Sequence, residues 1–297
     1  MGGPYESPAA SLGGRPSMPA DIIACAIFIA IFAAIGAGHM SIFQINLARG
    51  HKFIASGASF GFCFSRVIAN ILRETWACYP TNARIAIAAQ IFVNAGVLII
   101  MIINLIFAQR VLRAAFPRIG WTRAVSTAFK AMYGLVIISI IMLITCIIQS
   151  AYSLNANTHR IDRDIEIYGM TYFLVIAFLP LPIVLTVLFS GRGAKAEQFG
   201  TGSWKVKTGI ILAVSVLLTL GAGWRTGTAM MPTTLATNPP WYFHKACFYV
   251  FNFGMDGSAV GLYLFGRADK RFHVPDGSSQ RRTYDMVEEK MEEKDFV

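Results

Sequence analysis

IAIAAQIFVNAGVLIIMIINLIFA, residues 85–108, is the segment that most clearly indicates the fold of this chain. It contains no charged residue, and it is longer than the roughly 20 apolar residues that a helix needs to cross the hydrocarbon of a bilayer. Its apolar residues are continuous instead of recurring at every third or fourth position, so no face of the helix is reserved for water. The stretch therefore predicts a transmembrane helix.

Similar apolar blocks follow one another along the chain. Together with the first stretch they are Asp21–Leu47, Phe53–Leu72, Ile85–Ala108, Ala128–Ala151, Ile167–Phe189, Thr208–Gly227 and Phe243–Phe265. The connections are short, and a backbone in lipid must satisfy its hydrogen bonds within the chain. We therefore predict an all-α fold, a polytopic membrane protein built as a bundle of seven transmembrane helices.

The composition agrees with a chain that lies mostly in lipid. Of the 297 residues, 55% are hydrophobic and 14% are charged, whereas soluble domains have about 45–50% and 25%. The net charge of +10 does not indicate nucleic-acid binding, because the basic residues gather in short gaps between the apolar blocks. Basic residues at these places anchor helices at a membrane surface. The expected partner is the lipid bilayer and not nucleic acid.

Basic residues beside the ends of the blocks predict the orientation, because cytosolic loops carry an excess of Lys and Arg. Fourteen lie on one side, namely Arg49, Lys52, Arg110, Arg113, Arg118, Arg123, Lys130, Arg192, Lys195, Lys205, Lys207, Arg267, Lys270 and Arg271, and five on the other, namely Arg15, Arg73, Arg84, Arg160 and Arg163. We therefore expect the N-terminus outside and the C-terminus in the cytosol of a plasma membrane or endomembrane.

The two ends of the chain differ from the blocks. Residues 1–20 are rich in Gly, Pro, Ser and Ala and predict a disordered extracytoplasmic N-terminus, residues 21–266 form the transmembrane domain, and residues 267–297 form a cytosolic tail. The tail is either simply solvated or binds a cytosolic partner. The five cysteines are odd in number and lack metal-ligand spacing, so no disulfide framework, metal or cofactor is expected.

Charged residues inside the blocks are costly in lipid and mark candidate functional sites. Arg66 and Asn70 lie four residues apart on one face of the second helix, and Asn252 and Asp256 do so on the last. Arg66 is about 20 Å and Asp256 about 14 Å from the cytosolic end of its helix. We predict an intramembrane ion pair between Arg66 and Asp256, assisted by the two asparagines. The pair either locks two helices together or serves binding or gating.

A second polar group is predicted toward the outside. If its members converge, they line an outward-opening cavity; they are Glu74, Gln90, Asn94, Gln149, Arg225 and His244. Single members also have simpler interpretations. Arg225 can reach the membrane interface, Asn94 can form an interhelical hydrogen bond, and His244 with Lys245 can cap the last helix.

Small residues and prolines predict how the helices pack and bend. The second block contains Gly57-x-x-x-Gly61 and the last block contains Gly257-x-x-x-Gly261. Such faces let two helix backbones approach closely, so we expect these two helices to touch. Pro180, followed by a second proline two residues later, predicts a kink in the fifth helix.

Several segments resemble an uncharacterised family of fungal multispan membrane proteins known as a domain of unknown function. They are FGFCFSR (60–66), NAGVLI (94–99), NLIFAQRVLRA (104–114), FPRIGW (116–121), FLPLP (178–182) and DGSAVGLYLF (256–265). The resemblance covers about residues 20–275 and implies a fungal source and a seven-span fold, but no activity. In architecture alone the chain is similar to fungal lipid-translocating exporter-like proteins and to seven-helix receptors. It lacks the D/E-R-Y triplet that such receptors carry after the third helix.

These observations favour a transporter or binding protein for a small amphipathic or lipid-like molecule, using the polar core between the helices. One alternative is a receptor-like seven-helix sensor that signals through residues 110–130 and the tail. Another is an intramembrane cyclase-type enzyme of secondary metabolism, with Asp256, Glu74 or His39 as acid–base groups. GxxxxGK[ST], HExxH and DDxxD motifs are absent, which disfavours an ATP-driven pump and a hydrolase of the HExxH class. No catalytic residue is therefore assigned.

Overall fold

The computed structural model describes residues 3–5, 9–191 and 196–274, and helices dominate them. The long helices are α1 (Ala20–Ala48), α2 (Ile54–Cys78), α3 (Ala83–Ala115), α5 (Arg123–Tyr152), α6 (Ala156–Phe178), α7 (Pro180–Phe189), α8 (Trp204–Met230) and α10 (Met255–Phe265). Shorter elements are α4 (Pro117–Gly120), α9 (Lys245–Phe248), α11 (Ala268–Arg271), a 3-10 turn η2 (Trp241–Phe243) and a π-helical segment η3 (Tyr249–Gly254).

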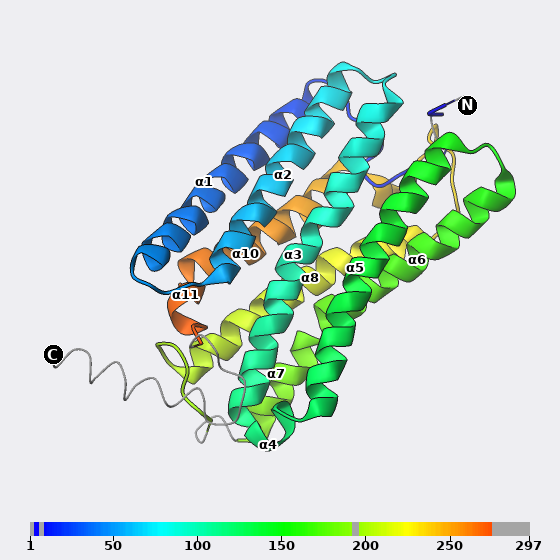
Figure 1. The fold of residues 1–297 in the computed structure, drawn as a ribbon. Coiled ribbons are helices and arrows are strands. Elements are labelled where there is room, and N and C mark those ends of the chain that lie inside the picture. The colour runs from blue at the N-terminus through cyan, green and yellow to red at the C-terminus, as the bar shows by residue number, and fades with distance from the viewer. Residues whose placement is uncertain (1–2, 6–8, 192–195, 275–297) are drawn as a thin grey trace.

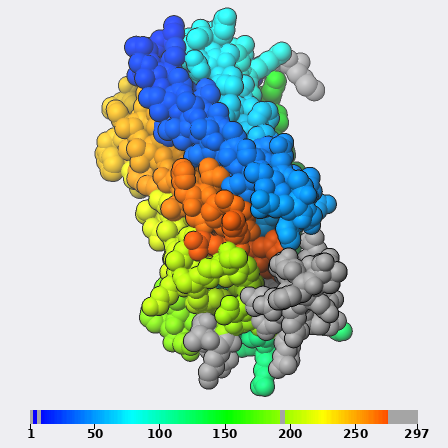
Figure 2. Space-filling model, turned by 90° about the vertical axis from the view of Figure 1, so that its left-hand side faces the viewer, coloured from blue at the N-terminus to red at the C-terminus, as the bar shows by residue number. Residues whose placement is uncertain are grey.

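The long helices pack side by side in a closed bundle (Figure 1). Neighbours in contact run from α1 through α2, α3, α5, α6 and α8 to α10, and α10 returns to α1. Figure 2 shows α10, in orange, lying beside α1, in blue. Helix α3 also contacts α6, α7, α8 and α10, and 61% of its apolar stretch is buried, against 22% for α1 and for α5. Residues 85–108 of α3 thus form the centre of the bundle.

Among the described residues, six helical stretches are long and apolar enough to cross a membrane: Ala20–Ala48, Ile54–Cys78, Ala83–Ala115, Arg123–Tyr152, Ala156–Phe189 and Trp204–Met230. Their outward faces are also apolar. On α1, Ile23, Ile27 and Ile31 are 58%, 54% and 41% exposed, and their spacing of four residues puts them on one face. A large apolar surface of this kind fits lipid and not water. The chain is an all-α protein with the character of an integral membrane protein.

The seventh predicted helix is not confirmed as a single transmembrane α-helix. The predicted block Phe243–Phe265 divides into the end of η2, then α9, η3 and α10, and none of these pieces is long enough alone to span a bilayer. In a π-helix each hydrogen bond reaches five residues along the chain instead of four, which interrupts the α-helical pattern. The block contains no proline that marks this interruption in the sequence.

The fifth predicted span begins earlier than its apolar block and is broken where expected. Helix α6 starts at Ala156 and not at Ile167, because the side chain of Asn155 accepts a hydrogen bond from the amide of Asn157 (2.9 Å) and caps the helix. The α6 helix ends at Phe178 and α7 starts at Pro180. Proline has no amide hydrogen to continue the helix, so the helix is interrupted at the place where the kink was predicted.

The small-residue faces of α2 and α10 do not pack against each other. A Cβ atom at Gly257 would meet Phe32 of α1, and one at Gly261 would meet Ile35 of the same helix. Gly57 of α2 faces α1 as well. Helices α2 and α10 do touch, through Arg66 and Asp256, but these glycines bring each of them close to α1 instead.

Residues 9–19 lie against one end of the bundle, although the sequence predicts disorder up to residue 20. The amide of Ala10 donates to the carbonyl of Thr234 (2.8 Å), and the amide of Gly13 donates to that of Phe243 (3.1 Å). Gly13 has a φ of 77°, and a Cβ at this position would lie 2.5 Å from the ring of Phe248. Only glycine fits both the backbone conformation and the close approach.

Candidate functional site

An ion pair lies in the middle of the bundle. The guanidinium of Arg66 is 2.6 Å from the carboxylate of Asp256, and the two side chains are 0% and 1% exposed. Arg66 Nη1 also donates to the carbonyl of Val93 on α3 (2.7 Å), and its guanidinium lies 5.4 Å from the ring of Phe62 and 5.7 Å from that of Phe253. The ion pair predicted from the sequence is therefore present, and it joins α2, α3 and α10.

The two asparagines do not assist this pair. Asn70 Nδ2 donates to the carbonyl of Arg66 (2.8 Å), and Asn252 Nδ2 donates to that of Phe248 (2.9 Å). Each thus binds the backbone four residues earlier in its own helical segment, because this carbonyl is the nearest acceptor on the same face. The prediction that they support the pair was wrong, although both side chains are fully buried near it.

A second buried guanidinium belongs to Arg225 on α8. It is 6% exposed, so it does not reach out to the membrane interface. Its Nε donates to the carbonyl of Gly221 (3.3 Å), and its Nη2 atom has no hydrogen-bond partner among the described residues. Arg225 is attracted by the Asp256 carboxylate and repelled by the Arg66 guanidinium. The core therefore holds two arginines near one carboxylate.

A small cavity lies beside Arg225. It is lined by Asn94, Val97 and Met101 of α3, Met170 and Phe173 of α6, and Ala222 and Arg225 of α8. The space accommodates about one water molecule. Two polar side chains, Asn94 and Arg225, thus share a pocket whose other walls are apolar.

The predicted outer cluster of six residues does not converge on one cavity. Asn94 and Arg225 share the small cavity, whereas Gln90, Gln149 and His244 are exposed and Glu74 is half-buried. Gln149 lies on α5, a peripheral helix whose apolar stretch is mostly unburied. The predicted cap is confirmed for His244, whose Nδ1 accepts a hydrogen bond from the amide at residue 246 (3.2 Å).

A second ionic network, centred on Asp21, was not predicted from the sequence. The fully buried carboxylate of Asp21 accepts from Arg73 (3.1 Å) and from the hydroxyl of Tyr249 (2.7 Å), and it forms an ion pair with Lys245. Arg73 also donates to the carbonyl of Gly13 (2.8 Å). Lys245, expected to cap the last helix at the surface, is paired here instead. One signal pointed to the network: Arg73 near a helix end needs an anion, and Asp21 lies at the same end of the bundle.

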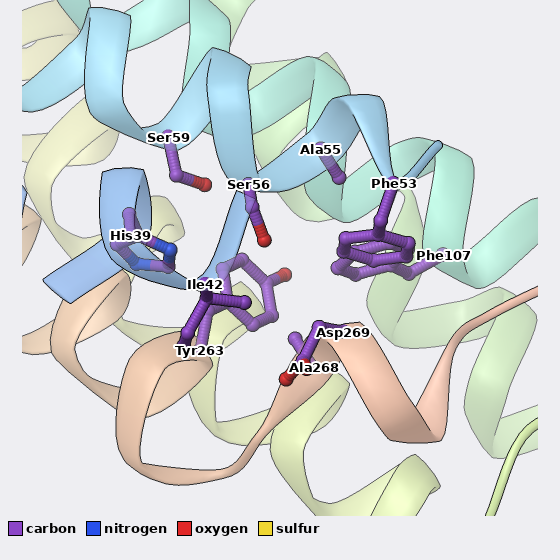
Figure 3. A pocket seen from close by; sticks show the side chains of 10 residues that line it. All are labelled: His39, Ile42, Phe53, Ala55, Ser56, Ser59, Phe107, Tyr263, Ala268 and Asp269. Atoms are coloured by element: carbon purple, nitrogen blue, oxygen red, sulfur yellow. The ribbon is translucent and has the colours of Figure 1, made fainter. Parts of the chain in front are cut away.

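At the opposite end, a second small cavity contains polar side chains from three parts of the chain (Figure 3). His39 Nε2 lies 3.2 Å from the carbonyl of Val260, so this nitrogen carries the proton. Its Nδ1 has no partner within the described residues. Tyr263 donates to Asn104 (2.7 Å), which in turn donates to Ser215 (2.8 Å). These bonds tie α1, α3, α8 and α10 together.

Asp269 on α11 lies at the rim of the same cavity and outside the apolar stretches. Burial opposes its charge, but hydrogen bonds from Arg267 (2.8 and 3.0 Å) and Asn46 (3.3 Å) outweigh burial and lower the pKa of the carboxyl. The bond to Asp269 in turn raises the pKa of Arg267. The carboxyl is therefore an anion that fixes the chain after α10 and not a proton donor at neutral pH.

Within the described ranges, no group of three His, Cys, Asp or Glu side chains is arranged to hold a metal ion. The five cysteines are free thiols, and Cys25, Cys63 and Cys146 are buried. In apolar surroundings such thiols behave as small hydrophobic groups.

Comparison with known protein families gives a match for part of the chain. Residues 203–273 match the model of a family described as Protein of unknown function (DUF3112). The matched segment contains α8 with Arg225 and the broken helix with Asp256. No curated protein and no solved structure matches the chain. The resemblance predicted from the sequence is thus confirmed for this segment, and it brings no activity with it.

Proposed function

We propose that the chain crosses the membrane seven times, with the N-terminus outside and the C-terminus in the cytosol. Six apolar stretches support six crossings, and residues 245–265 are helical throughout in three consecutive segments. Twenty-one helical residues are about the number that spans a bilayer. The contacts of α10 with both α1 and α8 also fit a last span that closes the bundle.

We further propose that this protein binds and transports a small amphipathic or lipid-like molecule through its polar core. The observation that carries the proposal is the Arg225 guanidinium, which lies with Asn94 at a cavity and has an unpartnered nitrogen. Ionisable groups at membrane depth are costly and typically mark a substrate path. The remaining walls, which include Met101 and Phe173, suit the apolar part of such a molecule.

A cavity that admits about one water cannot enclose a whole amphipathic molecule. The head group therefore enters the polar cavity while the apolar part lies between α6 and α8 or in the adjacent lipid. Opening this path requires α6 and α8 to separate. The break between α6 and α7 at Leu179 is a place where the backbone can absorb such a movement.

Transport is tested by the movement of fluorescently labelled phosphatidylcholine between the leaflets of proteoliposomes. Wild-type protein should accelerate this movement, and Asp256→Asn or Arg66→Ala should reduce the added rate about tenfold, because either change leaves a buried charge unpaired. Asp164→Asn is a matched control, since Asp164 is exposed. Thermal unfolding would show that each variant is folded.

A wild-type rate equal to that of protein-free liposomes would contradict transport of this lipid class. Equal rates for the wild type and both core variants would show that transport does not depend on the polar core. Conversion of a lipid in detergent, without a gradient, would instead identify an enzyme. Capture of a cytosolic protein through the tail would favour a receptor; most of that tail, residues 275–297, lies outside the described residues.

A further inference from the structure

The charges in the core do not balance. Arg66 and Arg225 are both at least nine-tenths buried, and Asp256 is the carboxylate with which both interact. Since arginine stays protonated in proteins, these three side chains carry a net charge of +1. An uncompensated charge in a medium of low dielectric constant costs several kcal/mol, so this surplus requires an explanation.

Arg66 is the arginine that the carboxylate neutralises directly, although its Nε has no hydrogen-bond partner among the described residues. It has the Asp256 carboxylate at 2.6 Å, the carbonyl of Val93 at 2.7 Å and two aromatic rings over its guanidinium. Within the part of the chain that the structure describes, Arg225 has one hydrogen bond, to a carbonyl of its own helix, and its Nη2 has no partner. The surplus positive charge therefore belongs to Arg225.

Carboxylates on the neighbouring helix α6 do not compensate Arg225. Asp162 interacts with Cys146 and His159, and Glu166 interacts with Arg163. The Asp21 network provides a useful contrast, since it also holds two cations around one carboxylate. There, the second cation, Lys245, is 31% exposed, so water can compensate it, whereas Arg225 is 6% exposed.

We propose that the cavity between Asn94 and Arg225 is an anion site, which binds the carboxylate head of an amphipathic acid or a free anion of similar charge and small size. This inference rests on the function proposed above and specifies the charge of the ligand. Arg225 pairs with the anion, and the side-chain amide of Asn94 donates a hydrogen bond to it. A single anion in this cavity neutralises the core.

The size of the cavity agrees with a small anionic group. Space for about one water also suits one oxygen of an anionic head group or one halide ion. Val97, Met101, Met170 and Phe173 exclude bulk water from the rest of the wall. In such surroundings the attraction between an anion and Arg225 is much stronger than in water.

The experiment measures the thermal unfolding midpoint of the full chain in nanodiscs of neutral phosphatidylcholine. Three probes are compared: sodium dodecanoate, the uncharged dodecanol, and sodium chloride in place of sodium sulfate. At about 100 times its Kd, dodecanoate should raise the midpoint by about 5 °C. Arg225→Gln should abolish the shift and Arg225→Lys should retain part of it, whereas Arg84→Gln at an exposed position should leave it unchanged.

Each result decides between the two proposals. A shift with dodecanoate that dodecanol lacks, and that Arg225→Gln removes, supports both. A shift with chloride alone that Arg225→Gln removes supports the anion site and contradicts a lipid-like ligand. Equal shifts with dodecanol and dodecanoate overturn the anion site but not the proposed function. If no probe acts on the wild type, or if Arg225→Gln responds like the wild type, the anion site is overturned.

The unliganded proteins provide a second test. Because Arg225 gains only one hydrogen bond, to the carbonyl of Gly221, Arg225→Gln should unfold at the same temperature as the wild type or above it when no anion is bound. A large loss of stability in Arg225→Gln without anion would show that the guanidinium is already compensated within the protein. That result would also overturn the anion site.

Discussion

At the scale of single residues, variants of the Arg66–Asp256 pair can distinguish a purely structural role of this pair from a role in transport. Asp256→Ala leaves the buried guanidinium without its carboxylate and should destabilise the protein by about 3–5 kcal/mol. The double variant Arg66→Met/Asp256→Leu should recover most of this loss, because apolar side chains of similar volume need no desolvation of charge. Thermal unfolding in detergent measures both effects. If the double variant also transports lipid at the wild-type rate, the pair only holds the helices together and takes no part in transport.

The same residues show what a sequence can reveal about a membrane core. Arg66 and Asp256 were predictable because a charge inside an apolar block stands out and needs an opposite charge at the same depth. Asp21 was not, because a carboxylate at the edge of a block looks like an ordinary interfacial residue. The hydrogen bonds of Asn70 and Asn252 depend on side-chain rotamers, which spacing along a helix does not determine.

At the scale of elements, the segment 9–19 makes a steric prediction. Gly13→Ala would place a methyl group 2.5 Å from the Phe248 ring at a φ of 77°, so the segment should detach from the bundle. Gly14 is a matched control, since it also has a positive φ but a Cβ there would meet nothing within 4 Å. Hydrogen exchange of the Ala10 amide, which donates to the carbonyl of Thr234, should therefore be about tenfold faster in Gly13→Ala than in Gly14→Ala. Equal rates would show that the contact with Phe248 does not hold the segment.

Helix positions and helix ends differ in how far the sequence predicts them. The apolar blocks located every long helix, because lipid requires a continuous apolar run. The start of α6 at Ala156 was missed, since the helix extends through a polar stretch beyond the apolar block. The π segment η3 was missed as well. It depends on how α9 and α10 pack on the bundle, and the sequence carries no breaking residue at that place.

At the scale of the whole molecule, the contacts between the helices show that α10 closes the bundle. Helix α10 lies between α1 and α8 and carries the carboxylate that pairs with α2 across the bundle. The contact between α1 and α10 thus closes the bundle. The sequence predicted the number of apolar blocks but not this closure, because blocks that are apolar on all sides do not reveal which faces meet.

The proposed seventh span, made of residues 245–265, gives a topology that cysteine labelling can test. Cys78, in the loop after α2, is exposed and should react with a membrane-impermeant maleimide added outside cells that carry the protein at their surface. In a Cys78→Ser/Cys247→Ser background, Lys52→Cys and Lys270→Cys, both at exposed positions, should react only after permeabilisation. The probe at position 270 separates the two counts of spans. With six crossings it would lie outside and react at once, because residues 245–265 would then return without crossing. With seven crossings and an inverted protein, all three probes would exchange sides, so each arrangement gives its own labelling pattern.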